Sequence, residues 1–493
     1  MMIYRIRLNW VVGSLFALIF LFLFTLRLGI FQDTESWKQE GLALTAQART
    51  DREIWMNILQ QGRKIGYAHR QFFKKDEGYQ VLESVSMQVN TLGMLQDVRF
   101  RTEGNFHQDM TLSSFEFELQ SSLFRFKAKG AFHEKKLTIV VDQGSGAEQK
   151  ISFPLQKGPY FSVALLDALH AENLQPGESK LLHVFDPATL AQRPVKIVFL
   201  GEETISIMGR EEKARKVSVD YMGAPQYAWI GKDGSVLREE GAFGLRLEQV
   251  PREEALKGDS LSPLIDLAEA ASLPANKVIQ HADRLKELKI RLKGIEERDI
   301  FLDGDRQTLR ESVLTIHKES VPSLSLQRQA RKGSKELETS LGSDLFIQSD
   351  HPVIQSKAKE IVSPSDSDRV KAEKLIQWVH EKIEKRPVLS VPSALETLQN
   401  GVGDCNEHAV LLAALARASG IPSQVEVGLV YQKGRFYYHA WNVLYLDRWI
   451  TADAVMGQFP ADVTHIRFVR GTERQVDLIR IIGNIRLEIL SFF

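Results

Sequence analysis

A period of two dominates the first half of the chain, where apolar and polar residues alternate over residues 54–250. A clear instance runs from residue 124 to residue 132, in which Phe, Ala and Gly alternate with Arg and Lys. This period predicts β-strands that bury one face and expose the other. Turn sequences such as Lys-Asp-Gly at residues 232–234 separate the runs. We therefore predict a large antiparallel β domain over residues 45–250, shaped as a curved sheet or an open barrel.

Two roles remain open for this β domain. An open barrel could hold a ligand on its concave face. A sheet of this size could equally act as a spacer or dock a partner protein of the cell envelope. The pattern of residues does not favour either role.

The pattern changes after residue 250 and becomes mixed. Apolar residues at helical spacing predict a helical connector over residues 251–284, and alternation over residues 288–316 predicts strands. Residues 318–343 are polar and lack a period, which is typical of a linker. We therefore expect residues 251–343 to form a connector, a strand segment and a polar linker.

From residue 344 onward, helical spacing is followed by strand-like segments. The apolar residues that recur at helical spacing are Ala372, Leu375, Ile376, Val379 and Ile383. They predict an amphipathic helix that packs on a core. Residues 424–490 are dense in strand-like sequence. Helices followed by an antiparallel sheet predict an α+β domain over residues 344–493.

An uncharged run of nineteen residues, 8–26, lies near the N-terminus and is rich in Leu, Phe and Val. As a helix it would be about 28 Å long, enough to span a hydrocarbon core. No small-residue cleavage site follows it, so we predict an uncleaved anchor over residues 1–31. Arg5 and Arg7 before the run favour a cytoplasmic N-terminus. We therefore expect a single-pass protein of the cell (inner) membrane with most of the chain outside the cytoplasm, and a multidomain α+β fold class that includes this transmembrane helix.

Charge and cysteine content narrow the chemistry. The chain has 493 residues, and 63 Lys and Arg balance 63 Asp and Glu, which argues against a nucleic-acid partner. Cys405 is the only cysteine, so internal disulfides, cysteine-rich zinc sites and iron–sulfur clusters are excluded for a monomer. No HExxH motif occurs. We expect no metal and no cofactor, and Cys405 is left as a candidate nucleophile.

Cys405 lies where a helix is predicted to begin. Asp404 precedes it as a good N-cap, and an alanine-rich helical pattern follows up to Gly420. A thiol in the first helical turn faces unpaired N–H groups and the positive end of the helix dipole, and both favour the thiolate. The same N–H groups could stabilise the oxyanion of a tetrahedral intermediate.

His439 and Asp453 lie on two consecutive predicted strands, and strand register decides whether they meet. A two-residue turn at Asp447-Arg448 would place them on opposite faces of the sheet. A longer loop would pair Val443 with Trp449 and set His439 directly opposite Asp453. We predict the second register, in which the aspartate orients the imidazole.

Several motifs, in this order, resemble one enzyme family. They are Gly403-Asp404-Cys405, Arg417-Ala418-x-Gly420-Ile421-Pro422, His439-Ala440-Trp441, and finally Trp449 and Asp453. They resemble the transglutaminase-like domain of the papain-type cysteine-enzyme superfamily, in its membrane-anchored bacterial form. The resemblance implies a papain-like fold over residues 344–493, with Cys405 as nucleophile, His439 as general base and acid, and Asp453 as orienting residue.

Other residues near these motifs are weaker candidates. Asn406, Glu407 and Trp441 are possible substrate-binding residues, although first-turn helix residues are commonly caps and a Trp is more often a packing wall. Asn406 stands where the animal crosslinking enzymes carry a Trp, which weakens an expectation of crosslinking or calcium dependence. His408 lies one turn after Cys405 as a rival base, and His465 lies near the site by resemblance without an assigned role.

The resemblance and the residues together predict attack of the thiolate on an amide or ester carbonyl, with a thioacyl intermediate. We expect a peptide or protein substrate, and favour a protease or amidase because the nearest resemblance is to envelope-facing bacterial members. A protein-crosslinking transglutaminase is the first alternative. The second is a non-catalytic envelope scaffold that uses the same fold for binding.

Overall fold

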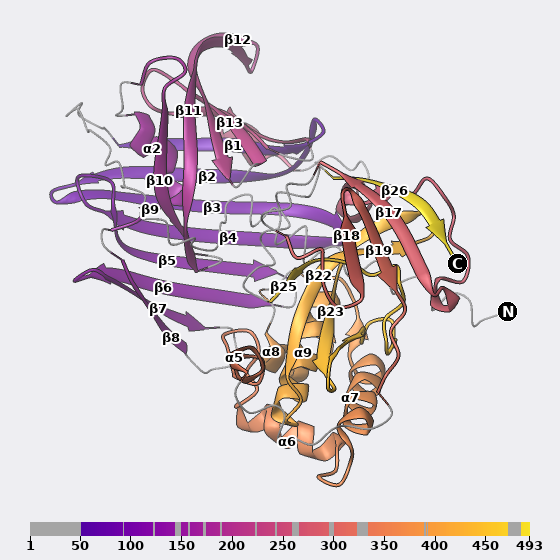
Figure 1. Cartoon of the computed structure of the whole chain (residues 1–493). Helices are drawn as coiled ribbons and strands as arrows, with labels where there is room; N and C mark the ends of the chain where they lie inside the picture. The colour runs from indigo at the N-terminus through magenta and orange to yellow at the C-terminus, as the bar shows by residue number, and fades with distance from the viewer. Residues whose placement is uncertain are drawn as a thin grey trace. The chain divides into compact units, whose positions relative to one another are not determined.

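The computed structural model divides into two compact units, Phe22–Asp266 and a second unit that contains Leu267–Phe493 (Figure 1). The residues described are 51–91, 93–121, 124–142, 149–155, 158–170, 174–187, 190–221, 224–241, 244–258, 266–294, 300–322, 334–388, 391, 393–471 and 485–493. The predicted membrane anchor, residues 1–31, lies outside them. Within the described residues, no helix has both the length and the apolar character needed to cross a membrane.

The predicted fold class, α+β with an N-terminal transmembrane helix, is wrong. The part of the chain that the structure describes is mostly β, with 52% strand and 19% helix. One reason is the size of the sheet in the first unit. Another is that the expected helical connector supplies only two short helices, α3 (Arg252–Ala255) and α4 (Leu267–Ala271).

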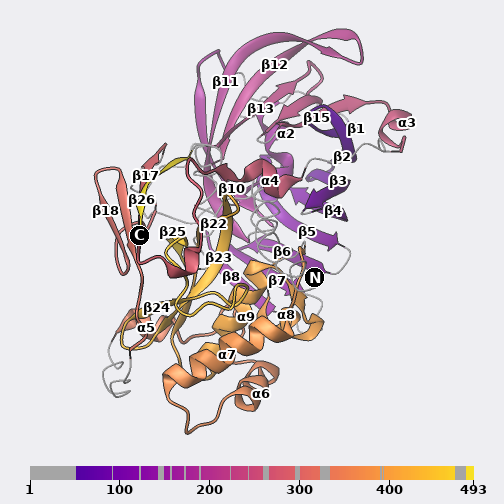
Figure 2. The same ribbon diagram turned by 90° about the vertical axis from the view of Figure 1, so that its right-hand side faces the viewer.

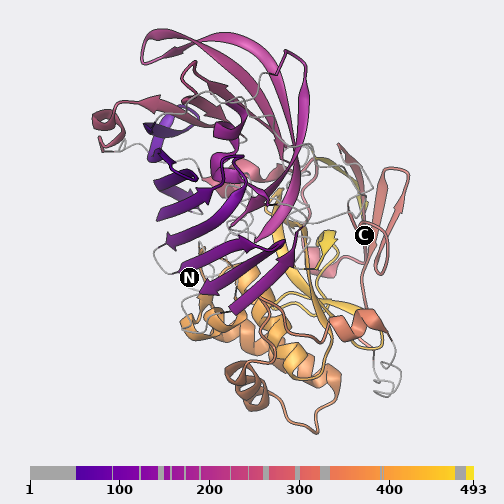
Figure 3. The same cartoon turned by 90° about the vertical axis from the view of Figure 1, so that its left-hand side faces the viewer.

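The first unit is built on one fifteen-stranded sheet, in the order β8-β7-β6-β5-β4-β3-β2-β1-β15-β14-β13-β12-β11-β10-β9. Its strands are β1 (Arg52–Gln60), β2 (Arg63–Lys75), β3 (Gly78–Thr91), β4 (Met94–Phe106), β5 (Leu112–Ser121), β6 (Arg125–His133), β7 (Lys136–Asp142), β8 (Gln149–Pro154), β9 (Tyr160–Phe161), β10 (Ser179–Asp186), β11 (Ala191–Ile207), β12 (Arg210–Tyr221), β13 (Ala224–Ile230), β14 (Val236–Glu240) and β15 (Leu245–Val250). Figure 3 shows the indigo and purple strands side by side in one curved layer. The path has two ends, β8 and β9, so the sheet is open.

The interior of this unit is filled by aromatic side chains and one short helical segment. The segment comprises η1 (Ser162–Ala164) and α2 (Leu165–His170). Phe161 lies 5.3 Å from Phe115 and 6.3 Å from Phe185, measured between ring centroids. All three side chains are buried, so apolar packing holds β9, and with it the start of the segment η1–α2, against the sheet.

The second unit combines small sheets with a group of helices. Its elements after α4 are β16 (Leu273–Pro274), η3 (Ala282–Arg284), β17 (Glu287–Lys293), β18 (Gln307–Arg310), β19 (Val313–His317), α5 (Lys335–Thr339), α6 (Pro352–Ile361), α7 (Asp368–Lys382), β20 (Glu384–Lys385), α8 (Ala394–Asn400), β21 (Val402–Gly403), α9 (Cys405–Ala418), β22 (Ser423–Gln432), β23 (Arg435–Tyr445), β24 (Trp449–Ala452), β25 (Ile466–Arg470) and β26 (Arg486–Phe492). The order β16-β23-β22-β25, with β24 on β23, forms the main sheet, and β18-β19-β17-β26 forms a second one. Figure 2 shows α6–α9 gathered beside β22 and β23.

From Leu267 onward, the residues expected to form the connector, strand segment and linker belong to this second unit. β16 pairs with β23, and β17 pairs with the last strand, β26. Phe301 and Gly304, which precede β18, accept hydrogen bonds from Arg467 of β25, as described below. This segment is therefore integrated into the unit by long-range strand pairing, which single-sequence periodicity does not reveal.

Candidate active site

Cys405 is the first residue of α9, and local sequence explains why the helix begins there. The Asp404 side chain accepts a hydrogen bond from Asn406 N at 3.0 Å, and Glu407 Oε2 accepts one from Asp404 N at 3.0 Å. The two bonds form a capping box. Gly403 is needed for this arrangement, because a Cβ there would lie 2.3 Å from the Cβ of Glu407. The thiol is buried at the positive end of a fourteen-residue helix.

Two of the candidate substrate-binding residues have contrasting surroundings. Glu407 is buried and its carboxylate is engaged in the capping box. The Asn406 side chain is also fully buried, and among the described residues neither its Nδ2 nor its Oδ1 has a hydrogen-bond partner. Glu407 therefore has a local structural task, whereas the amide of Asn406 keeps its hydrogen-bonding capacity.

His439 lies on β23, the strand on which α9 packs. Asn442 Nδ2 on the same strand donates a hydrogen bond of 2.8 Å to Ala409 O of the helix. His439 is fully buried. The helix that begins with Cys405 and the strand that carries His439 are therefore joined directly.

The predicted register of the β23–β24 hairpin is wrong by two residues. Trp449 pairs with Tyr445 instead of Val443, and the connecting residues are 446–448. The tight two-residue turn is not formed either. A shift of two residues keeps every side chain on its original face. For this reason His439 and Asp453 still lie on the same side of the sheet.

His439 and Asp453 form a short, buried hydrogen bond. His439 Nε2 donates to Asp453 Oδ2 at 2.6 Å, and Met456 N donates to Asp453 Oδ1 at 3.0 Å. Burial by itself would raise the pKa of Asp453, but the adjacent histidines hold it well below its usual value. A carboxylate only accepts, so Nε2 of His439 carries the proton. Its Nδ1 is then the basic atom, and among the described residues this Nδ1 has no hydrogen-bond partner.

The structure thus brings together two of the three candidate catalytic residues by a direct hydrogen bond. Cys405 lies at the start of the helix that packs on the His439 strand, but within the described residues no hydrogen bond links its sulfur to His439 Nδ1. Apo geometry often leaves such a bond long until substrate is bound.

His465 is the residue whose role the sequence left open. Its Nε2 donates to the same Asp453 oxygen at 2.9 Å, and its Nδ1 faces Asp462, 3.3 Å from the carbonyl oxygen and 3.4 Å from Oδ1. Burial would lower the pKa of His465, but the two carboxylates raise it to about 9. Because both ring nitrogens face acceptors, His465 is an imidazolium at neutral pH.

The three side-chain atoms that meet here could be considered for a metal ion. The ligand atoms of His439, Asp453 and His465 lie within 4.8 Å of one another. Ligands about 2.1 Å from a tetrahedral zinc ion would stand roughly 3.4 Å apart. The N–O separations of 2.6 Å and 2.9 Å are instead those of charge-assisted hydrogen bonds. We therefore describe the group as a proton-sharing cluster.

The indole ring of Trp441 packs beside the two imidazoles. Its ring centroid lies 6.1 Å from that of His439 and 5.1 Å from that of His465. Its Nε1 donates to Glu426 Oε2 at 2.8 Å. The indole N–H is thus engaged inside the protein, and the Trp441 side chain is almost fully buried.

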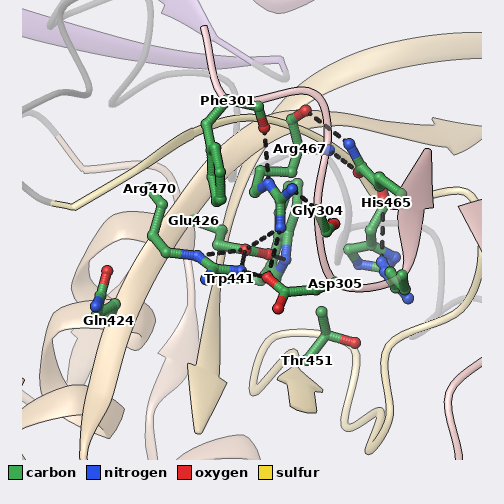
Figure 4. Close-up of polar contacts among 12 residues, drawn as sticks. Phe301, Gly304, Asp305, Gln424, Glu426, Trp441, Thr451, His465, Arg467 and Arg470 are labelled. Atoms are coloured by element: carbon green, nitrogen blue, oxygen red, sulfur yellow. Dashed lines mark hydrogen bonds and ion pairs between the residues drawn. The ribbon is translucent and has the colours of Figure 1, made fainter. Parts of the chain in front are cut away.

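Glu426 links Trp441 to a buried network of charged side chains (Figure 4). Its Oε1 accepts hydrogen bonds from Arg470 at 2.6 Å and 2.9 Å and from Arg467 at 3.2 Å. Burial would raise the pKa of Glu426, but the two guanidinium groups lower it to about 2. The network is therefore permanently charged and holds β22, β23 and β25 together.

A segment before the helices braces β25 and the turn that carries His465. Arg467 donates to Phe301 O at 2.8 Å and to Gly304 O at 3.0 Å, contacts that Figure 4 shows. Arg306 donates to Ala461 O at 2.6 Å and to His465 O at 3.0 Å. Periodicity predicted strands over residues 288–316, which include this segment, and did not indicate these contacts. In the sequence, the polar residues of this short loop were the one feature that could have indicated them.

Two further titratable groups lie close to the thiol helix. His408 Nδ1 donates to Asp404 O at 2.6 Å, and burial lowers the pKa of His408 to about 4, so the rival base is neutral and engaged. Half-buried Lys385 pairs with Gly403 across β20 and β21. Burial lowers the pKa of Lys385 to about 8, although Glu381 and Asp453 oppose the change.

One family profile matches the part of the chain that carries most of these features. Residues 355–454 match the Transglutaminase-like superfamily. The chain therefore contains a transglutaminase-like domain, and both Cys405 and the His439–Asp453 pair fall inside the matched segment. No curated protein sequence matches the chain.

Solved structures show distant likenesses. A candidate cysteine protease from Cytophaga hutchinsonii is 14% identical over 42% of this chain and 87% of its own, with a TM-score of 0.28. A β-barrel-like protein of unknown function from Brucella abortus is 14% identical over 41% of this chain and 96% of its own, with a TM-score of 0.32. A candidate protease from Parabacteroides distasonis is 12% identical over 80% of this chain and 64% of its own, with a TM-score of 0.20. At these values we draw no conclusion from them about chemistry or substrate.

Proposed function

We propose that this protein is a thiol-dependent acyl-transfer enzyme that cleaves a peptide-type amide, with Cys405 as nucleophile, His439 as base and Asp453 as orienting residue. The observation that carries the proposal is the buried 2.6 Å bond between His439 and Asp453 on the strand against which the Cys405 helix packs. A thiol enzyme also agrees with the transglutaminase-like match of residues 355–454.

The first half of the proposed reaction forms a thioester. His439 Nδ1 takes the proton of the Cys405 thiol, and the thiolate attacks the carbonyl carbon of the amide. The oxyanion of the tetrahedral intermediate accepts a hydrogen bond from the backbone N–H of Cys405 at the start of α9. Collapse of the intermediate breaks the C–N bond, His439 returns its proton to the leaving amine, and the acyl group stays on sulfur.

The second half releases the acyl group. His439 removes a proton from water, the hydroxide attacks the thioester, and Cys405 leaves as the thiolate, which is reprotonated through His439. The product is a carboxylic acid. An amine in place of water would give a new amide, and this is the transglutaminase outcome. We favour hydrolysis because Asn406 replaces the Trp found in the crosslinking enzymes.

The pH dependence of Cys405 alkylation tests the proposal, since the chain has one cysteine and the label is unambiguous. We expect a thiol pKa at least one unit below the usual value of about 8.5, rising toward that value in His439→Ala. The control is His317→Gln, because His317 is an exposed histidine on β19. An ordinary thiol pKa that His439→Ala leaves unchanged would contradict the enzyme and leave the binding scaffold as the better reading.

A second measurement separates the two acceptors. Acyl-enzyme is trapped on Cys405 with candidate peptides and followed by mass spectrometry, with water alone or with a primary amine present. We expect loss of the acyl group at the same rate in both conditions. Faster loss with amine, and an amide product, would indicate a transferase instead.

A further inference from the structure

Two histidines donate to one oxygen of a buried carboxylate. His439 Nε2 lies 2.6 Å and His465 Nε2 lies 2.9 Å from Asp453 Oδ2, and all three side chains are fully buried. A simple Cys-His-Asp arrangement requires only the first of these bonds. The second histidine therefore calls for its own explanation.

The two imidazoles differ in what their other nitrogen faces. Among the described residues, Nδ1 of His439 has no hydrogen-bond partner, whereas Nδ1 of His465 faces two oxygens of Asp462. A ring with acceptors at both nitrogens carries two protons, and a ring with one acceptor carries one. His439 is thus arranged to be a base, and His465 is arranged to stay a cation.

His465 is held from every side by groups that fix this state. Asp453 lies at the end of β24, and Asp462 lies in the turn before β25. From β23, the rings of His439 and Trp441 face it. From the segment before β18, Arg306 binds its carbonyl oxygen at 3.0 Å.

The Asp462 carboxylate accepts hydrogen bonds from three further donors. Its Oδ1 accepts from Thr464 N at 2.8 Å and Thr464 Oγ1 at 2.6 Å, and its Oδ2 accepts from Gln458 Nε2 at 2.9 Å. Arg306 itself is paired with Glu319 at 3.5 Å. Asp462 and Arg306, two of the charged groups around His465, are therefore each held in place by partners of their own.

We propose that His465 is a positioning residue of the site, an imidazolium that keeps Asp453 ionised and aimed at His439. Without it, Asp453 would hold one imidazole and one backbone N–H in a buried site, and the carboxylate would draw the proton of His439 more strongly. The proposal rests on the proposed function, because the benefit of a fixed Asp453 is the orientation of the His439 ring, which directs its Nδ1.

The consequence for pH follows from the sign of the shift. The pKa of His465 is raised to about 9, so the cation is present at neutral pH and is lost as pH rises through that value. Asp453 and Asp462 remain ionised throughout this range, since their pKa values lie below the usual one. The site then loses the His465 cation on the alkaline side only.

The test uses the full chain with His465→Ala and His465→Gln, and with His317→Gln as the matched control. Glutamine keeps an N–H donor for Asp453 but carries no charge. We expect His465→Ala to lower kcat by about 10- to 100-fold, the usual weight of a hydrogen bond to a charged group, with a smaller change in KM. We expect His465→Gln to recover part of that loss at pH 7 and to abolish the fall of kcat near pH 9.

An imidazole NMR titration of His465 in the Cys405→Ala protein gives a readout without catalysis. A pKa near 9 supports the proposal, and an ordinary value near 6.5 overturns it even if His465→Ala does not fold. A His465→Ala protein with wild-type kcat and pH profile also overturns it. If the thiol of the wild type proves inert while His465 titrates near 9, the proposed function fails and the pairing of His465 with Asp453 stands.

Discussion

Both units bury a carboxylate between two basic side chains, but these side chains differ in kind. In the first unit, Asp167 of α2 accepts from Arg52 and Arg70, each at 2.7 Å. In the second unit, Asp453 accepts from two histidines. Guanidinium groups keep their protons at every physiological pH, whereas an imidazole can give one up.

The difference between guanidinium and imidazole partners distinguishes a cluster that stabilises the fold from one that can take part in proton transfer. The Asp167 cluster ties α2 to β1 and β2 and has no proton to exchange, so we interpret it as structural. The Asp453 cluster holds a histidine whose second nitrogen has no hydrogen-bond partner among the described residues. Glu426 resembles Asp167, because its partners Arg467 and Arg470 also keep their protons, although Glu426 lies beside the site. A buried carboxylate is thus a poor indicator of catalysis unless one of its hydrogen-bonded partners can gain or lose a proton.

The largest effect is expected from Asp453→Asn. The amide can no longer fix the His439 tautomer that leaves Nδ1 basic, and the same change in a serine triad lowers kcat by about 10⁴-fold. We expect acyl transfer to fall by about 10³- to 10⁴-fold with the fold retained, measured as single-turnover acylation of Cys405. Activity within threefold of wild type would remove Asp453 from the mechanism.

The matching change in the first unit, Asp167→Asn, should act on stability instead. It leaves two buried guanidinium groups without their anion, which costs about 3–5 kcal/mol when a buried pair is broken. We expect hydrogen exchange in β1 and β2 to accelerate while the alkylation profile of Cys405 stays unchanged. A change in that profile would contradict the division between structural and chemical clusters.

Glu426→Gln should have an intermediate effect. The amide oxygen can still accept from Trp441, but Arg467 and Arg470 lose their shared charge. We expect a loss of about 2–4 kcal/mol in unfolding free energy of the second unit and less than a tenfold change in kcat. Chemical denaturation followed with the kinetics of the same preparation would measure both. A loss of activity as large as that of Asp453→Asn would place Glu426 in the chemistry.

The smallest effect is the pH dependence of stability. Asp453, Asp462 and Glu426 have lowered pKa values, so their stabilisation is complete above pH about 4–5 and is lost as pH falls. His465 has a raised pKa, so its contribution is complete below pH about 6.5 and is lost as pH rises through about 9.

We expect the thermal midpoint of the second unit to be highest between about pH 5 and pH 6.5 and to fall on both sides. Scanning calorimetry across pH 3–10 would measure it, with His465→Gln as the comparison. The variant should lose the decline on the alkaline side and keep the decline on the acidic side. An unchanged alkaline decline would assign it to another group.

The sequence determined those features that depend on neighbouring residues. The start of α9 follows from Asp404 and Glu407, which cap it within four positions of each other. The period of two also placed His439 and Asp453 on one face. That placement survived a register shift of two residues, because the shift preserves the side of the sheet on which each residue lies.

Only the tertiary structure decided the rest. Arg306 reaches His465 across 159 positions, and Arg467 reaches Phe301 across 166. Contacts of this length leave no period in the chain, so the sequence did not show that a segment expected to form strands also supports the site. The fold class was misjudged because fifteen strands outweigh the helices of the second unit. Local hydrogen bonds, and the side of a sheet on which a residue lies, can be derived from sequence alone. Which distant group a charged side chain pairs with depends on how the helices and strands pack together.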